Sequence, residues 1–275
     1  MWSILFHVST ADKDKLLLGL WELGVSGAIE EVENVRAFFP DEADRAKVLE
    51  LAGEFHGAEV RIDAIEEPSF KQDNWDPILI GERFFIAPPW VNGPVSSSRL
   101  RLELDSATAF GTGRHETTQL CLEALETYLR QSDTVLDVGC GSGILSLAAR
   151  LLGAQNIFSC DIHRDAIDTA LRHVTTPVFL GSADAVSNTT CDLVLANISA
   201  AVLDRLAFDL ERITKPNGWL IASGFIHEKL PQLYRPEETL ERGDWLCWIC
   251  RPEGILAETV SASQTGLSHV AEWWL

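Results

Sequence analysis

The stretch TVLDVGCGSGILSLAA, residues 134–149, decides the fold of this chain. Its first residues form an apolar run that predicts a buried strand with Asp137 near its carboxyl end. Glycines at 139, 141 and 143 then make a GxGxG turn, and an apolar helical run follows. Such a turn offers backbone N–H groups and close approach, so it marks the edge at which parallel sheets bind ligands.

The spacing of these glycines narrows the choice of ligand. A dinucleotide fingerprint has its third glycine one position later, where this chain has Ile144, so NAD binding is only a minor alternative. The strand, its acid and the turn of Gly139 and Gly141 together indicate a site for S-adenosylmethionine.

Helices and strands alternate from Thr118 onward, which predicts a mostly parallel, doubly wound sheet with helices on both faces. We therefore assign an α/β, Rossmann-like domain to residues 106–252. A short helix is expected at 227–234, and the expected strands are 134–139, 156–161, 177–181, 191–197, 216–224 and 245–250.

The remainder of the chain has a different pattern. Residues 1–67 follow the order strand, helix, strand, strand, helix, strand, which predicts a small ferredoxin-like α+β domain. Residues 68–105 contain five prolines and two tryptophans, so we expect a linker with a short strand pair at 81–88 and 99–105. Residues 253–275 form a tail of unassigned role.

Composition limits the functional class. The formal net charge of −19, with 15 acidic and 6 basic residues in the first 67, disfavours direct nucleic-acid binding and favours a basic partner. Solubility alone is the alternative explanation of this charge. Apolar runs are too short to cross a bilayer and the N-terminus lacks a signal pattern, so we expect a cytoplasmic monomer without membrane contact.

The six cysteines lie mostly in apolar runs, which favours reduced core thiols over disulfides. Cys247 and Cys250 match CxxC, but residues three apart on a strand face opposite sides. We therefore expect no metal site.

Three polar residues follow the strands of the sheet. Asp161 lies about 20 residues after the glycine turn, where a carboxylate can accept both ribose hydroxyls, although it can also cap the next helix. Asp184 suits either an adenine amino group or a turn. Asn197 ends the next strand, where its amide can orient an amine nucleophile or cap a helix.

With the segment AFGTGRHETT, residues 109–118, these motifs resemble those of class I methyltransferases and, more narrowly, the PrmA family. The resemblance covers residues 1 to about 250 and includes the linker segment NWDPILIGERFFIAPPW. GTGRHETT is its most specific motif. Many members have GTGTHPTT, so Arg114 and Glu116 depart from the family pattern. A role that the family gives to a threonine at position 114 therefore does not apply to this chain.

The resemblance implies a protein N-methyltransferase that transfers methyl groups from S-adenosylmethionine to lysine or N-terminal amino groups of a large-subunit ribosomal protein. The small domain would recruit this basic protein. Alternatives are a methyltransferase of another protein or a small amine, and a module that binds the cofactor without transfer. The residue roles that follow from the resemblance are cofactor contacts at Thr118, Gly139, Asp161 and Asn197, and Thr112 beside the methyl group.

One histidine in the loop, His115, is the single candidate general base, and it is equally placed to brace the loop. A strong base is not required, because an amine entering a partly desolvated site has a lowered pKa.

Overall fold

The computed structural model describes residues 2–9, 12–25, 27–30, 34–39, 43–55, 58–59, 77–87, 99–103, 113–232 and 234–254. The expected tail at 253–275 lies outside this set except for its first two residues. In the described helices, no segment is long and apolar enough to cross a membrane.

A seven-stranded sheet forms the larger part of the molecule, with the strand order β10-β9-β8-β11-β12-β14-β13. The first five of these strands are parallel, whereas β14 runs antiparallel to β12 and β13 antiparallel to β14. This confirms the predicted mostly parallel sheet. The strand bounds are β8 (Thr134–Val138), β9 (Asn156–Asp161), β10 (Val178–Leu180), β11 (Cys191–Asn197), β12 (Thr214–Ile226), β13 (Glu238–Arg242) and β14 (Trp245–Cys250).

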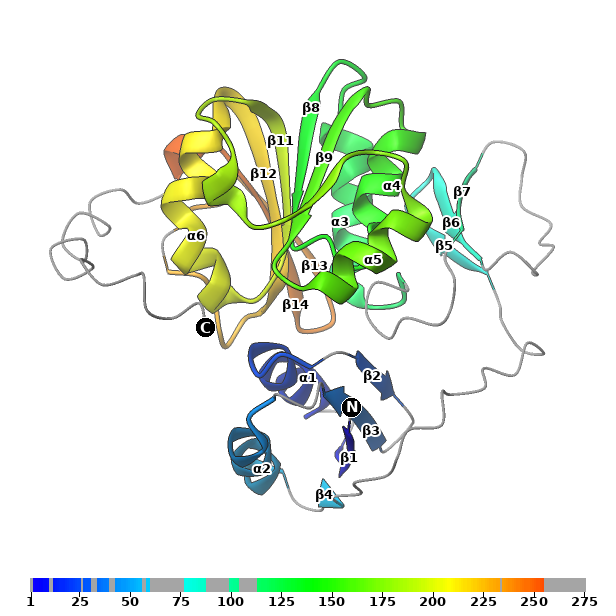
Figure 1. Cartoon of the computed structure of the whole chain (residues 1–275), viewed down its shortest axis with the longest axis vertical. Coiled ribbons are helices and arrows are strands. Elements are labelled where there is room, and N and C mark those ends of the chain that lie inside the picture. Colours follow the sequence, from blue (N-terminus) through cyan, green and yellow to red (C-terminus); the bar gives the residue numbers. More distant parts are fainter. Residues whose placement is uncertain are drawn as a thin grey trace, which may run out of the picture.

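Helices cover both faces of this sheet (Figure 1). Three helices pack on one face and α6 packs on the other, and two separate clusters of buried apolar side chains fill the two layers. The carboxyl ends of the parallel strands consequently stay open for a site. The helices are α3 (Glu116–Tyr128), α4 (Ile144–Leu151), α5 (Arg164–His173) and α6 (Ala200–Ile213).

The N-terminal elements follow the expected order of strands and helices. Their strands pair antiparallel in the order β2-β3-β1-β4, and Ile4 and Phe6 of β1 are fully buried. The bounds are β1 (Trp2–His7), α1 (Lys13–Glu22), β2 (Gly27–Glu30), β3 (Asn34–Phe39), α2 (Arg45–Glu54) and β4 (Ala58–Glu59).

Between these two parts, β5 (Ile78–Ile80), β6 (Phe84–Ile86) and β7 (Leu100–Leu102) form a small three-stranded sheet. The expected strand pair corresponds to β6 and β7, which run parallel. The prediction of a helix at 227–234 was wrong, because the described residues there form turns and a bridge between Ile226 and Lys229. Pro231 interrupts that short segment and removes a backbone donor.

Candidate active site

The glycine turn lies between β8 and α4, as expected. Gly139 and Gly141 have φ angles of +72° and +53°, which favour glycine, and the N–H of Gly139 donates to the carbonyl of Cys160 at 2.9 Å. A Cβ added at Gly139 would lie 2.6 Å from the side chain of Ile198, whereas one at Gly141 would meet no atom within 4 Å. The turn is therefore packed on one side and open to a ligand at Gly141.

Asp161, at the end of β9, lies directly beside this turn. Its carboxylate accepts from the N–H of Gly141 at 3.1 Å and from the N–H of His163 at 2.9 Å, and the residue is only 7% exposed. The N-cap of α5 is His163, so Asp161 does not occupy the capping position and instead holds the segment that leads into the helix. Each carboxylate oxygen has capacity for a further donor, as ribose hydroxyls require.

Asn197, at the end of β11, contacts Thr118 in the first turn of α3. The Nδ2 of Asn197 donates to Oγ1 of Thr118 at 3.4 Å, and the Oδ1 of Asn197 is buried with no partner among the described residues. The N-cap of α6 is Ser199, so Asn197 does not occupy the capping position. An unsatisfied buried carbonyl oxygen is costly unless a donor, such as an amine, is bound there.

His115 occupies the N-cap of α3, as the bracing interpretation requires. Its Nδ1 accepts from the N–H of Thr117 at 3.3 Å and lies 2.8 Å from Oγ1 of the same residue. Burial lowers the pKa of His115 to about 4, so the imidazole is neutral at pH 7 and is a weak base. The geometry favours the cap over a catalytic base.

Asp137 lies beneath the turn rather than at its open side. Oγ of Ser146 donates to Oδ2 of Asp137 at 2.6 Å and lies 2.7 Å from Oγ of Ser159. Burial raises the pKa of Asp137 to about 6, against the hydrogen bond from Ser146, which lowers it. Asp137 therefore fixes the first turn of α4, which directly follows the glycine turn, and the sequence did not predict the contact with Ser146.

The remaining predicted residues are distributed as follows. Thr112 lies outside the described residues, and Arg114 is exposed. Asp184 lies in the one-turn 3₁₀ helix η2 (Ala183–Ala185), whose carbonyls are held by Arg212 of α6. Arg212 was not singled out in the sequence, since its position at the end of a helix predicts only a favourable interaction with the helix dipole.

The two cysteines of the CxxC motif face opposite sides of β14. Cys247 belongs to the core under α3 and α4, and Cys250 to the core under α6, which confirms the alternation expected on a strand. The described residues contain no group of three or more metal-ligating side chains.

The site residues fit the cofactor suggested by the sequence. Asp161 and the open face of Gly141 meet on the edge that also carries Asn197 and Thr118. S-adenosylmethionine and an incoming amine need a carboxylate for hydroxyls, a glycine turn for close approach and an amide oxygen that can accept from the amine. The Oδ1 of Asn197 can accept, because none of the described residues donates to it.

Comparison with known proteins gives the same family. A model of the family "Ribosomal protein L11 methyltransferase (PrmA)" matches residues 9–252. A ribosomal protein L11 methyltransferase of Anoxybacillus flavithermus is 37% identical over 195 residues, which are 65% of this chain and 62% of that relative. One from a Thermoanaerobacter species is 30% identical over 261 residues, 84% of each chain.

Among solved structures, a ribosomal protein L11 methylase from Lactobacillus delbrueckii subsp. bulgaricus aligns with a TM-score of 0.59 and 29% identity. The alignment covers 64% of this chain and 99% of that one. On the family match and the arrangement of its site, this chain belongs to the ribosomal protein L11 methyltransferase (PrmA) family.

Proposed function

We propose that this protein transfers methyl groups from S-adenosylmethionine to lysine or N-terminal amino groups of ribosomal protein L11. The observation that carries the proposal is the buried Oδ1 of Asn197, which has no hydrogen-bond partner in the described part of the chain, while its own amide nitrogen contacts Thr118 at the start of α3. An amine donating to Oδ1 satisfies that oxygen and is held with its lone pair free for attack.

The residues on this edge divide into two roles. Gly139, Gly141, Asp161 and Thr118 hold the cofactor, which supplies an activated methyl group on sulfur when it is bound. Asn197 contacts the cofactor and orients the amine. For Thr112, which is outside the described residues, the family resemblance suggests a role beside the methyl group. Asp161 supports this role because its carboxylate is already fixed against the glycine turn by two backbone N–H groups.

No strong general base is needed in this arrangement. His115 has a pKa of about 4 because it is buried, and its Nδ1 is engaged with Thr117. A lysine side chain entering the same partly desolvated edge has its pKa lowered, so a fraction of neutral amine is present near neutral pH. Orientation then supplies several kcal/mol of the barrier reduction.

The small domain at residues 1–67 is proposed to recruit the substrate, and residues 68–105 to link it to the methyltransferase domain at 106–252. Its excess of acidic residues suits a basic ribosomal protein. Helix α1 of this domain contacts the methyltransferase domain through ion pairs of Lys15 with Glu228, at 3.0 Å, and of Glu22 with Lys229. These contacts support recruitment next to the site.

Incubation of the protein with methyl-labelled S-adenosylmethionine and purified L11 tests the proposal. We expect label in L11, with mass increments of whole methyl groups at amino groups, and a much smaller signal with the Asn197→Ala variant. Free lysine and a short lysine peptide serve as comparison acceptors. Equal turnover on them would favour a small-amine enzyme, and no label on any large-subunit protein would overturn the proposal.

We further propose that the enzyme acts as a cytoplasmic monomer on the protein itself, without direct nucleic-acid binding. The net charge of −19 supports this, because it repels phosphate backbones. Light scattering after gel filtration should give a mass near 30.4 kDa, and ribonuclease treatment should leave methylation of purified L11 unchanged.

A further inference from the structure

The connection between β10 and β11 borders the proposed cofactor site. It begins at Gly181, whose N–H donates to the carbonyl of Asp161 at 2.9 Å, and it carries Asp184. The only helical element in this connection is the single turn η2, and the connection ends where β11 begins at Cys191. We call residues 181–190 the adenine loop, because they carry Asp184, the acid that the sequence offers for the adenine amino group of the cofactor.

A single arginine from another element gathers the backbone of this loop. Arg212, in the last turn of α6, donates to the carbonyls of Ala183 and Asp184 at 3.0 and 3.1 Å. It also donates to the carbonyl of Val186 and, at 3.0 Å, to Oδ1 of Asn188. Its guanidinium therefore contacts four residues of the loop.

The charge of Arg212 is balanced where it lies. Its Nε donates to Oδ1 of Asp209, one turn earlier in α6, at 2.9 Å, and its side chain is only 19% exposed. With this contact, all five N–H directions of the guanidinium have acceptors. Such a fixed, multiply bonded arginine loses little further entropy when it holds a neighbouring segment.

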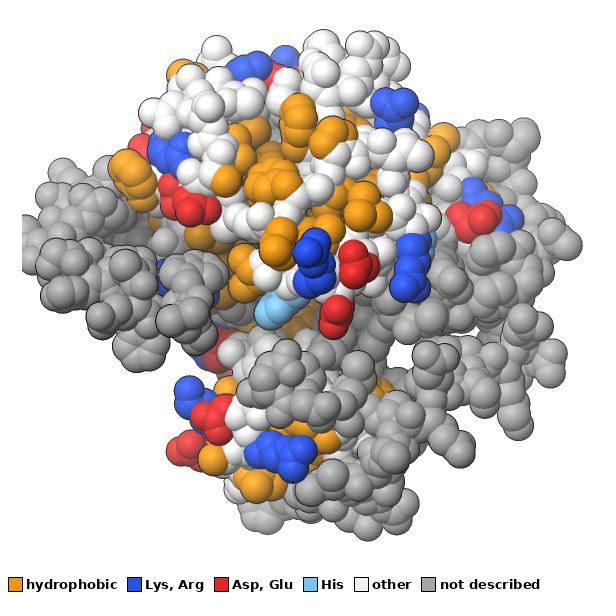
Figure 2. All heavy atoms as spheres, viewed as in Figure 1, with side chains coloured by type: hydrophobic (Ala, Val, Ile, Leu, Met, Phe, Trp, Pro, Cys, Tyr) orange, Lys and Arg blue, Asp and Glu red, His pale blue; other side chains and the backbone are white. Residues whose placement is uncertain are grey.

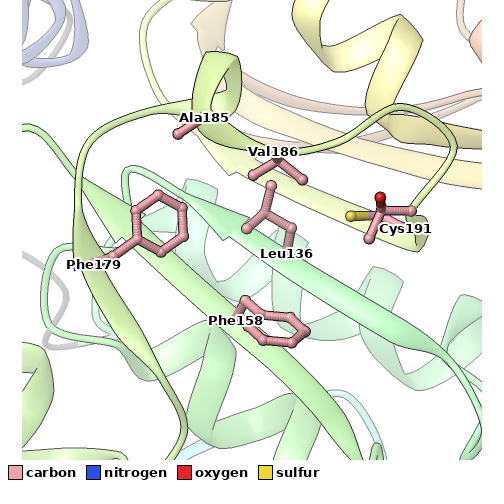
Figure 3. A pocket seen from close by; sticks show the side chains of 7 residues that line it. Leu136, Phe158, Phe179, Ala185, Val186 and Cys191 are labelled. Atoms are coloured by element: carbon pink, nitrogen blue, oxygen red, sulfur yellow. The ribbon is translucent and has the colours of Figure 1, made fainter.

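Packing holds only part of the loop: Ala183 is fully buried in the core under α6, and Val186 packs against the same core. A cavity of about 300 Å³ lies beneath the loop, and Figure 3 shows the side chains of Ala185 and Val186 across this space from Leu136 and Phe158. Phe158 is 40% exposed, and Figure 2 shows hydrophobic side chains gathered on this face of the larger domain. Residues 184–188 are exposed or half-buried, so the hydrogen bonds from Arg212 hold this part of the loop.

We propose that Arg212 is a positioning residue for cofactor binding: it fixes the adenine loop so that the Asp184 carboxylate can accept from the amino group of the cofactor's adenine. This inference rests on the proposed function. Arg212 contacts the carbonyls of the loop and the side chain of Asn188, so it acts through the loop and not on the cofactor itself. Its loss loosens the adenine end while the methyl-transfer end, formed by Asn197 and Thr118, is unchanged.

The variants Arg212→Gln and Arg212→Lys test this. We expect the KM for S-adenosylmethionine and the Kd for its product S-adenosylhomocysteine to rise about tenfold for Arg212→Gln, as for the loss of a few charged hydrogen bonds. The value of kcat should stay within about twofold, since the loop does not touch the amine. Arg212→Lys, which keeps the charge but not the fork of donors, should be intermediate.

Arg251→Gln is the matched control. Arg251 also holds a turn through backbone carbonyls, those of Asn217 at 2.7 Å and Gly218 at 3.1 Å, but this turn is near the start of β12 and is separate from the loop that carries Asp184. It should lower thermal stability as Arg212→Gln does and leave the KM for the cofactor unchanged.

Several results would overturn the inference. A fall in kcat at unchanged KM, an equal KM rise in Arg251→Gln, or an unchanged Kd in both Arg212 variants contradicts it. If Arg212→Gln does not fold, Arg212→Lys and Asp184→Asn decide, since both should raise Kd. Failure of the unmodified protein to bind S-adenosylhomocysteine would instead overturn the proposed function.

Discussion

The indole ring of Trp21, in α1 of the small domain, lies 5.0 Å from the imidazole ring of His115 at the start of α3. Trp245, the first residue of β14, completes the contact, with its ring 5.5 Å from that of Trp21 and 4.6 Å from that of His115. A residue of the small domain thus covers the loop that leads into Thr118. The position of the small domain and the environment of this histidine are therefore coupled.

The coupling predicts a change in the pKa of His115 when Trp21 is replaced by alanine. Burial holds this pKa at about 4, and removal of the indole exposes the ring, so the pKa should rise toward the ordinary value near 6.5. Titration of the imidazole by NMR measures it. Trp219→Ala is a matched control, because Trp219 packs against Tyr128 and not against His115.

Docking of the small domain should depend on pH, because the pKa values of groups at the junction are shifted. Since the pKa of His115 is lowered, its contribution to docking is complete above about pH 6.5 and is lost as the pH falls toward 4. Asp14 and Glu116 lie at the same junction with pKa values raised by burial, so their protonation favours docking and opposes this loss. An identical His115 titration in Trp21→Ala would show that the domains do not meet here in solution.

Asp161 and Asn197 should have separable effects on the reaction. Asp161→Ala removes an acceptor that is fixed beside the glycine turn, so the Kd of the cofactor should rise about 10–100-fold. Asn197→Ala should chiefly lower kcat, by roughly tenfold or more, because the amine loses its orienting oxygen. Calorimetric titration and initial rates distinguish the two.

Exposed residues of the same types provide the controls for these variants. Asp165→Ala alters an exposed acid in the first turn of α5, and Asn156→Ala an exposed amide at the other end of β9. Both should leave Kd and kcat unchanged. The reverse pattern, with kcat reduced in Asp161→Ala and Kd raised in Asn197→Ala, would exchange the roles.

Alanine substitutions at two glycines can distinguish the effect of backbone strain from the effect of lost contact with the cofactor. Gly141 and Gly243 have similar positive φ angles, +53° and +59°, and a Cβ at either position meets no atom within 4 Å. Alanine should therefore cost each about 1–2 kcal/mol of unfolding free energy. Only Gly141→Ala should also weaken cofactor binding, as calorimetry can show. Equal binding in both variants would mean that the cofactor does not approach Gly141.

Local patterns in the sequence were sufficient for the methyltransferase core. The glycine turn directly follows its apolar strand in the chain, and Asp161 and Asn197 are the last residues of β9 and β11. Their arrangement therefore follows from strand and helix periodicity and from the common edge at which parallel strands end. The edge strand β13 was missed because its sequence, ETLER, lacks an apolar alternation. Pairing with β14, rather than propensity, makes it a strand.

Contacts between distant segments had no sequence signal. Trp21 and His115 are 94 positions apart in the chain and Arg212 and Asp184 are 28 apart, and neither pair has a spacing typical of a motif. Asp137 was placed correctly at the end of its strand, but its side chain lies under the turn because strand residues alternate between faces. Such orientations depend on the packed structure.

Asp137 itself provides a test of this buried position. Because burial raises its pKa to about 6, the group stabilises the fold most below its ordinary pKa, and this stability is lost as the pH rises from about 4 to 6. Asp137→Asn lacks this loss, so relative to the unmodified protein it should gain up to ~3 kcal/mol of unfolding free energy over that range.

Urea unfolding at several pH values measures this difference, and Asp192→Asn supplies the opposite case. Burial alone would raise the pKa of Asp192, but its contacts with Lys215 and with the N–H of Thr134 lower it further than burial raises it. The stability that Asp192 contributes is therefore lost as the pH falls, so Asp192→Asn should lose relative stability as the pH rises. If the Asp137→Asn curve runs parallel to that of the unmodified protein, then folding does not raise the pKa of Asp137 and its burial in the folded state is wrong.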